Sequence, residues 1–310
     1  MRDIRDSRDL KGLWAAMPTP WNDRGKFDAG VLDRNVERYA AIPMDGVYTT
    51  DSDGEFYAIE LDEFKRVIGV FAKAMDRTDM AVAAGVTWCN TQGIIDRMSV
   101  CLDNGICCFH VAYPFWMPLG PTDVSRFWED LASAVPEGRW VHYNTPRAGL
   151  LMKGKDYSWI AESHPEQFVG VKMGTVDVVD MAECMSGAPS LAYLATDYVT
   201  AYAMMLGAAG VCSYWANTLP HWTRRLMDLC LARKWEEARQ MQNRLLEWET
   251  RHIAAWREAG HLHGIIGKAR ASLSGWLEEN RVSRPPYYPV DDALFARVKA
   301  EFDRFWAGES

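Results

Sequence analysis

The sequence predicts a (β/α)8 barrel, or TIM barrel, followed by a C-terminal helical appendage. Eight short apolar runs alternate with longer amphipathic segments between residues 12 and 232, and eight strand–helix units are the number that such a barrel requires. The runs are continuously apolar, which is typical of parallel strands covered on both faces. A doubly wound sheet is the competing fold, but no G-x-G-x-x-G motif follows the first run, so the usual dinucleotide site of that fold is missing.

The predicted strands span residues 13–17, 46–50, 80–84, 107–112, 140–143, 168–172, 191–195 and 210–214. Helical patterns lie between them. One covers residues 61–75, where the apolar side chains fall on a single stripe. Another begins at Pro121, because Pro121, Thr122 and Asp123 together form a helix-start signal.

From about residue 233 the pattern changes to helices alone. They are predicted over 235–256, 265–277 and 291–306, the last one after the turn sequence RPPYYP at 284–289. We therefore expect an N-terminal arm over residues 1–11, the barrel over 12–232, and a helical region over 233–310 that packs on the barrel.

Composition and charge exclude several classes of protein. Hydrophobic residues make up 48% of the chain and charged residues 25%, which is the balance of a soluble globular protein. The net charge is -8 and no basic block occurs, so nucleic acid is not an expected partner. No apolar run approaches the ~18 residues of a membrane span, and the charged first nine residues do not resemble a signal peptide. We expect a cytoplasmic protein.

Cysteine and histidine patterns give no sign of a metal site. The seven cysteines are an odd number without a C-x-x-C pair, which indicates reduced thiols rather than disulfides or a zinc site. His261 and His263 are two residues apart, so on a helix they would face opposite ways, and no third ligand is evident.

The candidate catalytic residues are polar residues at the ends of apolar strands, because TIM barrels carry their active sites at the carboxyl ends of the strands. Lys172 ends the run FVGVK. Partial desolvation there would lower its pKa from about 10.4, toward a free amine that attacks carbonyls; alternatively, the side chain simply reaches water. Tyr143 ends another strand, and its phenol would either shuttle a proton or hydrogen-bond to the backbone.

A third strand end, TTDSDGE at 49–55, crowds hydroxyls, carboxylates and a glycine into one loop. Gly54 permits a tight turn that would point backbone amides at a substrate carboxylate. A calcium loop would need more ligands and a distant glutamate, so the segment predicts no metal.

In their order along the chain, these segments resemble the dihydrodipicolinate synthase/N-acetylneuraminate lyase family of Schiff-base-forming pyruvate aldolases. The matching motifs are MPTP at 17–20, DGV at 45–47 before DSDGE at 51–55, YN at 143–144 before Pro146, VGVK at 169–172, and GAAG at 207–210 before Ser213 and Asn217. The C-terminal part is most similar to the hydratase-aldolases that cleave aromatic 2-oxobut-3-enoates, through GKAR at 267–270, GWL at 275–277 and RPPY at 284–287. The segments GLWAAMPTP at 12–20 and PFW at 114–116 point the same way.

The resemblance implies a carbon–carbon or carbon–oxygen lyase that needs no cofactor beyond a covalent imine. Lys172 would form this imine with the 2-keto group of pyruvate or a pyruvate-derived acid. Tyr143 would relay protons, with Ser52 as its hydroxyl partner. Backbone amides around Ser52, Asp53 and Gly54 would hold the substrate carboxylate. Because the family often forms tetramers, a homotetramer is also implied.

Further substrate-binding roles are expected around this centre. A charged Asp53 about 4 Å from the substrate carboxylate would cost about 4 kcal/mol at an effective dielectric near 20, so Asp53 must point away, be protonated or contact a polar part of the substrate. We expect Asp51 and Asp53 to select the distal end of the substrate; the alternative is a pair of solvated loop carboxylates. Glu55 is expected to fix the loop through backbone hydrogen bonds. The remaining predicted substrate contacts are Trp116 near a subunit interface, Arg147 paired with a carboxylate of the substrate or of Glu55, and Thr145, Ser213 and Asn217.

Departures from the family keep three functions open. Asp51 and Asp53 stand where relatives usually have glycine and a hydroxyl residue or phenylalanine. Arg147 directly follows Pro146, one position earlier than the carboxylate-binding arginine of the synthases, so lysine biosynthesis is not predicted. Thr145 replaces the asparagine of the hydratase-aldolases. The leading function is a Schiff-base-forming lyase or aldolase that acts on pyruvate or a pyruvate-derived 2-oxo acid, with a hydratase-aldolase of an aryl 2-oxobut-3-enoate as its more specific form. The alternatives are dehydration of a 2-keto-3-deoxy sugar acid and a non-catalytic regulator that binds a keto acid.

Overall fold

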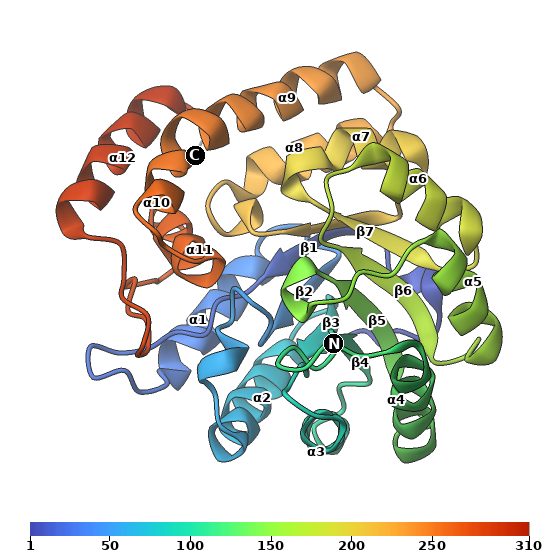
Figure 1. Ribbon diagram of the computed structural model, residues 1–310. Helices are drawn as coiled ribbons and strands as arrows, with labels where there is room; N and C mark the ends of the chain where they lie inside the picture. Colours follow the sequence, from blue (N-terminus) through green and yellow to red (C-terminus); the bar gives the residue numbers. More distant parts are fainter. Residues whose placement is uncertain (310) are drawn as a thin grey trace.

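The computed structural model describes residues 1–309, and its centre is a closed barrel of eight parallel strands (Figure 1). Each strand pairs with its neighbours in chain order, and β8 closes the barrel on β1. A doubly wound sheet would leave two open edges, so the predicted TIM barrel is confirmed. The strands are β1 (Gly12–Ala16), β2 (Gly46–Thr49), β3 (Ala81–Gly85), β4 (Cys108–Val111), β5 (Arg139–Asn144), β6 (Phe168–Met173), β7 (Ala192–Thr196) and β8 (Gly210–Ser213).

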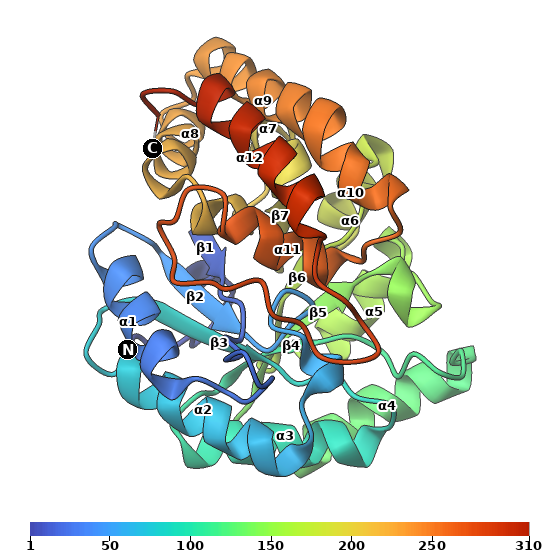
Figure 2. The ribbon, with the colours of Figure 1, turned by 90° about the vertical axis from the view of Figure 1, so that its left-hand side faces the viewer.

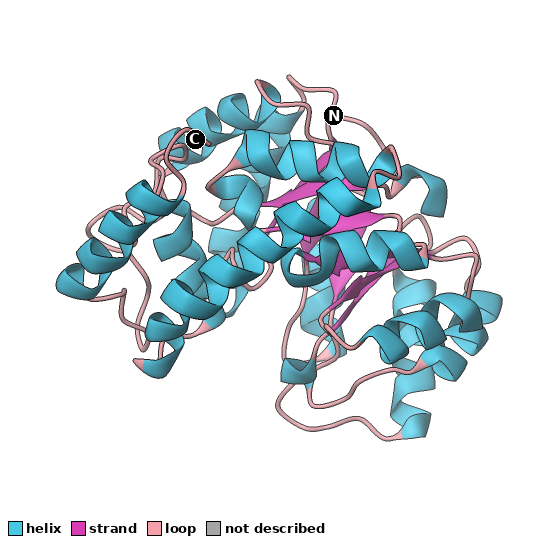
Figure 3. Ribbon diagram, turned by 90° about the horizontal axis from the view of Figure 1, so that it is seen from above, coloured by secondary structure: helices cyan, strands magenta, loops and turns pink. Residues whose placement is uncertain are grey.

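Helices surround the barrel on the outside (Figure 3). They are α1 (Ala29–Ala40), α2 (Leu61–Met75), α3 (Thr91–Asp103), α4 (Pro121–Ala134), α5 (Gly154–Ser163), α6 (Val178–Gly187), α7 (Thr200–Leu206) and α8 (Pro220–Leu231). The stripe predicted for α2 is buried, because Phe64, Val67 and Phe71 pack in the layer between helices and strands. The start of α4 is also as predicted, with the Gly120 amide donating to the Asp123 carboxylate at 2.9 Å.

The C-terminal helices pack on the barrel, and Figure 2 shows α11 beside the strands with α9, α10 and α12 beyond it. They are α9 (Trp235–Trp248), α10 (Ala254–Glu258), α11 (His263–Ala271) and α12 (Asp292–Phe305). Two predicted helices differ from the structure. The one over 235–256 is interrupted by a π-helical turn, Glu249–Ile253. The one over 265–277 ends at Ala271 and is followed by a turn in which Gly275 has a positive φ of 71°.

The π-helical turn has a consequence for the barrel mouth. It places Glu249 in the interior, where its carboxylate accepts hydrogen bonds from the Trp215 indole at 2.8 Å and the Tyr198 hydroxyl at 2.8 Å. Arg270 of α11 also pairs with Glu249, at 3.0 Å. The appendage is thereby joined to the segments that follow β7 and β8.

The described residues contain neither a disulfide nor a membrane-crossing helix. All seven cysteines are free thiols, and Cys108 is buried inside the barrel while Cys107 is half-buried. Within residues 1–309, no helix combines the length and the apolar character needed to cross a bilayer.

Candidate active site

Lys172 and Tyr143 lie side by side at the carboxyl ends of β6 and β5, where they are direct register partners. The Lys172 Nζ is 4.1 Å from the centre of the Tyr143 ring and 4.3 Å from that of Tyr48. Tyr48 belongs to β2, which is not a neighbour of β6 in the barrel, so the contact crosses the barrel interior. Lys172 is only 7% exposed. The amine therefore lies inside the closed ring of strands, next to the phenol with which it was predicted to work.

Asp51 is the ion-pair partner of this amine. Its Oδ2 accepts a hydrogen bond from Lys172 Nζ at 2.7 Å and lies 2.7 Å from Nδ1 of His110, a residue of β4. All three side chains are buried. The prediction that Asp51 selects the distal end of the substrate is therefore wrong, and so is the solvated-loop alternative. The positive φ of Thr50, 56°, turns the chain inward directly after β2 and brings Asp51 over the barrel.

The ion pair also changes the expected ionisation of the lysine. Burial by itself lowers the pKa of Lys172, as predicted, but the adjacent Asp51 carboxylate outweighs burial and holds the pKa above its ordinary value. Burial opposes the charge of Asp51 as well, but Lys172 and His110 outweigh it and lower the pKa of that carboxyl. Burial lowers the pKa of His110 in spite of Asp51. The resting site is thus a neutral imidazole beside an ammonium–carboxylate pair.

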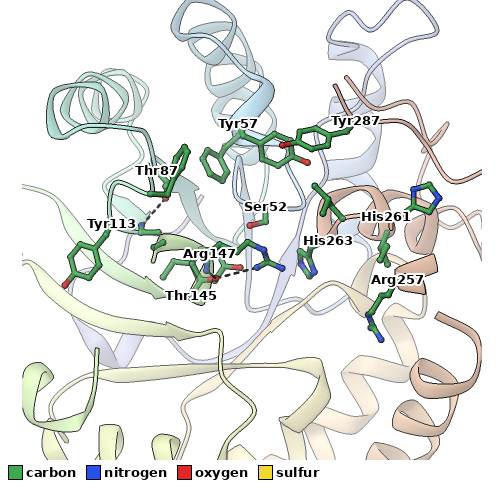
Figure 4. Close-up of a pocket in the computed structure, with 18 of the residues that line it drawn as sticks. Ser52, Tyr57, Thr87, Tyr113, Thr145, Arg147, Arg257, His261, His263 and Tyr287 are labelled. Carbon is green, nitrogen blue, oxygen red and sulfur yellow. Dashed lines mark hydrogen bonds between the residues drawn. The ribbon is translucent and has the colours of Figure 1, made fainter. Parts of the chain in front are cut away.

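A cavity of about 660 Å³ lies at the barrel mouth, and Figure 4 shows part of its lining; Lys172 and Asp51 are not among the lining residues. Ser52 and Tyr143 both contribute to the lining. Within residues 1–309, no hydrogen bond joins their hydroxyls, nor do the amides of Ser52 and Asp53 have a hydrogen-bond partner. Because Ser52 lines the cavity, its amide is consequently available for the carboxylate of a ligand.

The rest of the 51–55 loop is fixed from outside the cavity. The Gly54 carbonyl accepts from the Thr19 hydroxyl at 2.7 Å, and a Cβ on Gly54 would lie 2.5 Å from the Thr50 nitrogen, so the turn requires glycine. Glu55 accepts from the Trp21 indole at 2.6 Å and lies 3.3 Å from Lys268 of α11. Glu55 thus fixes the loop through its carboxylate and also through backbone hydrogen bonds, from its amide to the Ser52 carbonyl at 3.2 Å and from the Ala58 amide to its own carbonyl at 2.8 Å.

Asp53 faces α11 and is not part of the cavity lining. Its Oδ2 is 3.3 Å from Nε2 of His263, and its Oδ1 lies where a Cβ on Gly267 would be. Burial raises the pKa of the Asp53 carboxyl, but the attraction of His263 outweighs it and the net pKa is lowered. Of the three options considered for Asp53, the contacts place the carboxylate away from the cavity and toward α11.

The cavity has an aromatic wall and a polar wall. Four rings in consecutive edge-to-face contacts form the first: Phe115, Phe56, Tyr57 and Tyr287. The polar wall consists of Thr145, Arg147, Arg257, His261, His263 and Arg270. No aspartate or glutamate lines the cavity within the described residues.

Arg147 reaches into the middle of this cavity toward His263, below Ser52 (Figure 4). Its only side-chain hydrogen bond within residues 1–309 is a long one, 3.5 Å, to the hydroxyl of Thr145. The predicted alternative of an Arg147–Glu55 pair is wrong, because Glu55 is buried against Trp21 and Lys268. The guanidinium remains free to meet an anionic ligand.

Two predicted substrate contacts are structural instead. The Ser213 hydroxyl donates to the Asp197 carboxylate at 2.6 Å and accepts from the Ala216 amide at 2.9 Å. Asn217 donates to the Ala16 carbonyl at 2.7 Å and accepts from the Tyr39 hydroxyl at 2.6 Å. Both are buried and neither lines the cavity. The predictions for Ser213 and Asn217 are wrong because their polar groups hold the tight turn after β8.

Trp116 lies outside the cavity. It is 81% exposed and lines a separate hollow together with the 70% exposed Met117. A single chain therefore does not bring Trp116 to Lys172, and its predicted place near a subunit interface stays a prediction.

Sequence reasoning missed several residues that shape the site. His110 is a polar side chain within an apolar strand, as is His142, and that signal was available in the sequence. Arg257 and Arg270 could not be found in this way, because the helices that carry them reach the mouth only through the fold of the appendage. No group of three or more potential metal ligands occurs among residues 1–309.

With the geometry in place, comparisons with known proteins identify the family. Residues 9–303 match the dihydrodipicolinate synthetase family. The chain belongs to this family. It is therefore an enzyme of the lyase class that is typical of these Schiff-base aldolases.

Relatives that are named for two different enzymes are similar to this chain. A 4-hydroxy-tetrahydrodipicolinate synthase of Thermus thermophilus is 26% identical over 96% of each chain. A trans-O-hydroxybenzylidenepyruvate hydratase-aldolase of Pseudomonas aeruginosa is 22% identical over 97% of this chain and 93% of the relative.

Solved structures share the fold. YagE of Escherichia coli K12, in complex with pyruvate, superposes with a TM-score of 0.85 at 18% identity, covering 96% of this chain and 98% of YagE. PhdJ bound to a substrate intermediate gives 0.84 at 22% identity, covering 99% and 98%.

Proposed function

We propose that Lys172 forms an imine with the 2-keto carbon of pyruvate or of a pyruvate-derived 2-oxo acid. The observation that carries the proposal is the position of the Lys172 amine, buried in the barrel beside the Tyr143 ring at 4.1 Å. Membership of the dihydrodipicolinate synthetase family supports it. No external cofactor is required, because a protonated imine is itself an electron sink.

In the proposed reaction the Lys172 ammonium first loses one proton to solvent, and the free amine adds to C2 while a second nitrogen proton passes to the former keto oxygen. The resulting carbinolamine hydroxyl leaves as water after taking a proton from the Tyr143 phenol. When the C3–C4 bond breaks, its electron pair moves toward the imine nitrogen and gives an enamine. The proton of the C4 hydroxyl then passes to the Tyr143 oxygen. Ser52 would assist this transfer as a hydrogen-bond partner, while the amides of Ser52 and Asp53 and the Arg147 guanidinium would hold the substrate carboxylate.

For the substrate, we propose an aryl-substituted 2-oxo acid, handled as in a hydratase-aldolase. The edge-to-face wall from Phe115 to Tyr287 offers aromatic contacts to a flat ring. Such pairs contribute about 0.5–1.5 kcal/mol each beyond the burial of area.

A second candidate, dehydration of a 2-keto-3-deoxy sugar acid, is favoured by the opposite wall. Thr145, His261 and His263 there could hydrogen-bond to hydroxyl groups. Turnover of aryl aldehydes with pyruvate, compared with turnover of 2-keto-3-deoxy sugar acids, separates the two candidates.

Borohydride reduction in the presence of pyruvate tests the imine itself. Peptide mass spectrometry should find one reduced pyruvyl adduct, on Lys172, and none in Lys172→Ala. Lys268 is an internal control, because it is also a buried lysine paired with a carboxylate, but it lies on α11 rather than in the barrel. An intact protein with no adduct would favour the regulator function, and labelling of Lys268 instead of Lys172 would contradict the assignment of the nucleophile.

We also propose a cytoplasmic homotetramer, in which a neighbouring subunit covers the hollow beside Trp116. The support is the exposure of Trp116 and Met117 on one surface, together with the usual assembly of the family. Light scattering should give the mass of four chains. Trp116→Asp should lower that mass, and a monomeric unmodified protein would contradict the proposal.

A further inference from the structure

The proposed imine chemistry requires a positive charge on the Lys172 nitrogen inside the barrel. The Lys172 ammonium and the protonated imine each carry one positive charge at the same nitrogen. Their interconversion with the keto group and water is balanced: the ammonium and the ketone give the iminium ion and one water molecule. A buried cation is costly in both states unless an anion accompanies it.

From the contacts of Asp51 we infer that this residue is the counter-ion of the Schiff base, and that His110 is the residue that positions it. Asp51 Oδ2 lies 2.7 Å from Lys172 Nζ. Asp51 is the sole carboxylate within ion-pair distance of this amine in residues 1–309. This inference rests on the proposed function and adds a residue to it.

The carboxylate is held in one place by three strand ends. Thr50, which precedes it, donates its hydroxyl to the Gly85 carbonyl at 2.9 Å. Gly85 ends β3, and a Cβ there would overlap Asp51 Oδ1. His110 on β4 lies 2.7 Å from the opposite oxygen, Oδ2.

The protonation of His110 follows from that of Asp51. Since Lys172 and His110 together keep Asp51 ionised in spite of burial, the carboxylate can only accept hydrogen bonds. His110 is neutral, so its single proton is assigned to Nδ1. Its Nε2 is buried and has no hydrogen-bond partner within the described residues. The imidazole therefore orients Asp51 without adding a charge.

Other titratable groups near Lys172 do not replace Asp51. Burial raises the pKa of Tyr48 well above its ordinary value and that of Cys212 to about 12, so both are neutral. Asp53 is charged but is paired with His263. Tyr143 supplies a ring face at 4.1 Å rather than a carboxylate. The groups that face the ion pair are thus Tyr48 from β2, His110 from β4, Tyr143 from β5 and Cys212 from β8, while the Asp53 carboxylate is turned toward α11.

If Asp51 is the counter-ion, replacing it should lower the pKa of Lys172. Removing the carboxylate removes the charge that holds the ammonium, so the pKa of Lys172 falls and the free amine is available at lower pH. An opposite charge at this distance shifts a pKa by about one to three units. In Asp51→Asn, the pH midpoint of pyruvate trapping by cyanoborohydride should therefore move downward by about one to three units. Asp53→Asn, which removes a loop carboxylate paired elsewhere, should move it by less.

A second readout requires no substrate. With 13Cε-labelled lysine, the titration of Lys172 is followed by NMR in the unmodified protein and in Asp51→Asn, after assignment through Lys172→Arg. We expect a midpoint above the ordinary lysine value of about 10.4 in the unmodified protein and a lower midpoint in the variant. Asp51→Gly is the second variant if Asp51→Asn does not fold.

The outcomes separate this inference from the proposed function. Absence of pyruvate trapping at every pH would contradict the assignment of the imine to Lys172. In that case the NMR titration would still decide whether Asp51 pairs with the Lys172 amine. Trapping with the same midpoint in the unmodified protein and in Asp51→Asn or Asp51→Gly would overturn the counter-ion role alone. A Lys172 midpoint below the ordinary value in the unmodified protein would overturn it as well, even if neither variant folds.

Discussion

Gly85, at the end of β3, provides the space in which the Asp51 carboxylate lies, because a Cβ at position 85 would overlap Asp51 Oδ1. Asp51 in turn meets the amine of β6. A glycine on one strand thus determines the electrostatic environment of a lysine on another.

Gly85→Ala should therefore act on the lysine from a distance. Overpacking in a well-packed interior costs about 1–3 kcal/mol of stability. The displaced carboxylate should also lower the Lys172 midpoint, in the same direction as Asp51→Asn. Chemical denaturation measures the loss of stability, and the pH dependence of pyruvate trapping measures the change in the Lys172 midpoint. Gly69→Ala, in α2, where an added Cβ would lie in ordinary contact 3.6 Å from Asn104, is the control for the pH profile. An unchanged profile in a destabilised Gly85→Ala would show that the contact is purely structural.

The Glu55–Lys268 pair should be important for stability. Both side chains are 1% exposed, so Glu55→Ala leaves a buried ammonium without its partner and also removes the acceptor of the Trp21 indole. Breaking a buried pair in this way costs about 3–5 kcal/mol. Urea denaturation checks it, with the exposed Glu60→Ala as the control, expected within about 0.5 kcal/mol of the unmodified protein. A loss no larger than that of the control would contradict the role given to Glu55.

Glu279 should make the folded state less stable as the pH rises. Burial raises the pKa of this carboxyl from 4.5 to about 7, so between these values the folded state binds a proton that the unfolded state has released. The contribution is therefore fully present below pH ~4.5 and is lost as the pH approaches ~7, a change of about 3 kcal/mol at 1.36 kcal/mol per unit.

Glu279→Gln removes this titration, and the fall in stability between about pH 4.5 and 7 should become smaller. Denaturation of both proteins across this range measures the difference. Asp197, whose pKa burial raises to about 7, keeps a fall of the same sign in the variant. Equal slopes in the two proteins would refute the assignment to Glu279.

Arg147 should matter for binding of the substrate rather than for folding. Its guanidinium lines the cavity and has only a long hydrogen bond, to Thr145. Hydrogen bonds to charged groups contribute about 1.5–3 kcal/mol, so Arg147→Ala should raise the pyruvate concentration for half-maximal trapping by about ten- to a hundredfold. Arg126→Ala, on the exposed face of α4, is the control. An unchanged half-maximal concentration in Arg147→Ala would remove Arg147 from the binding site.

The barrel could be predicted because its signal is local and repeated. Each of the eight strands contains a continuous apolar run, and each lies within one or two residues of its predicted bounds. The lysine of β6 and the tyrosine of β5 were also visible, since each ends such a run.

Partnerships across the barrel could not be predicted. Asp51 meets Lys172 and His110, which are 121 and 59 residues away in the sequence, and only the closed barrel brings them together. Ser213 and Asn217 were misassigned for the opposite reason. Their resemblance to a family segment reflects a shared turn after β8, and the hydrogen bonds that occupy them are invisible in the sequence.

A crystal structure of the protein reduced with borohydride in the presence of pyruvate tests the central claim most directly. The account predicts that C2 of the reduced pyruvyl group is bonded to Lys172 Nζ inside the barrel, with its carboxylate at the amides of Ser52 and Asp53. A Lys172 amine that remains unmodified, while the protein carries the adduct elsewhere, would contradict the account.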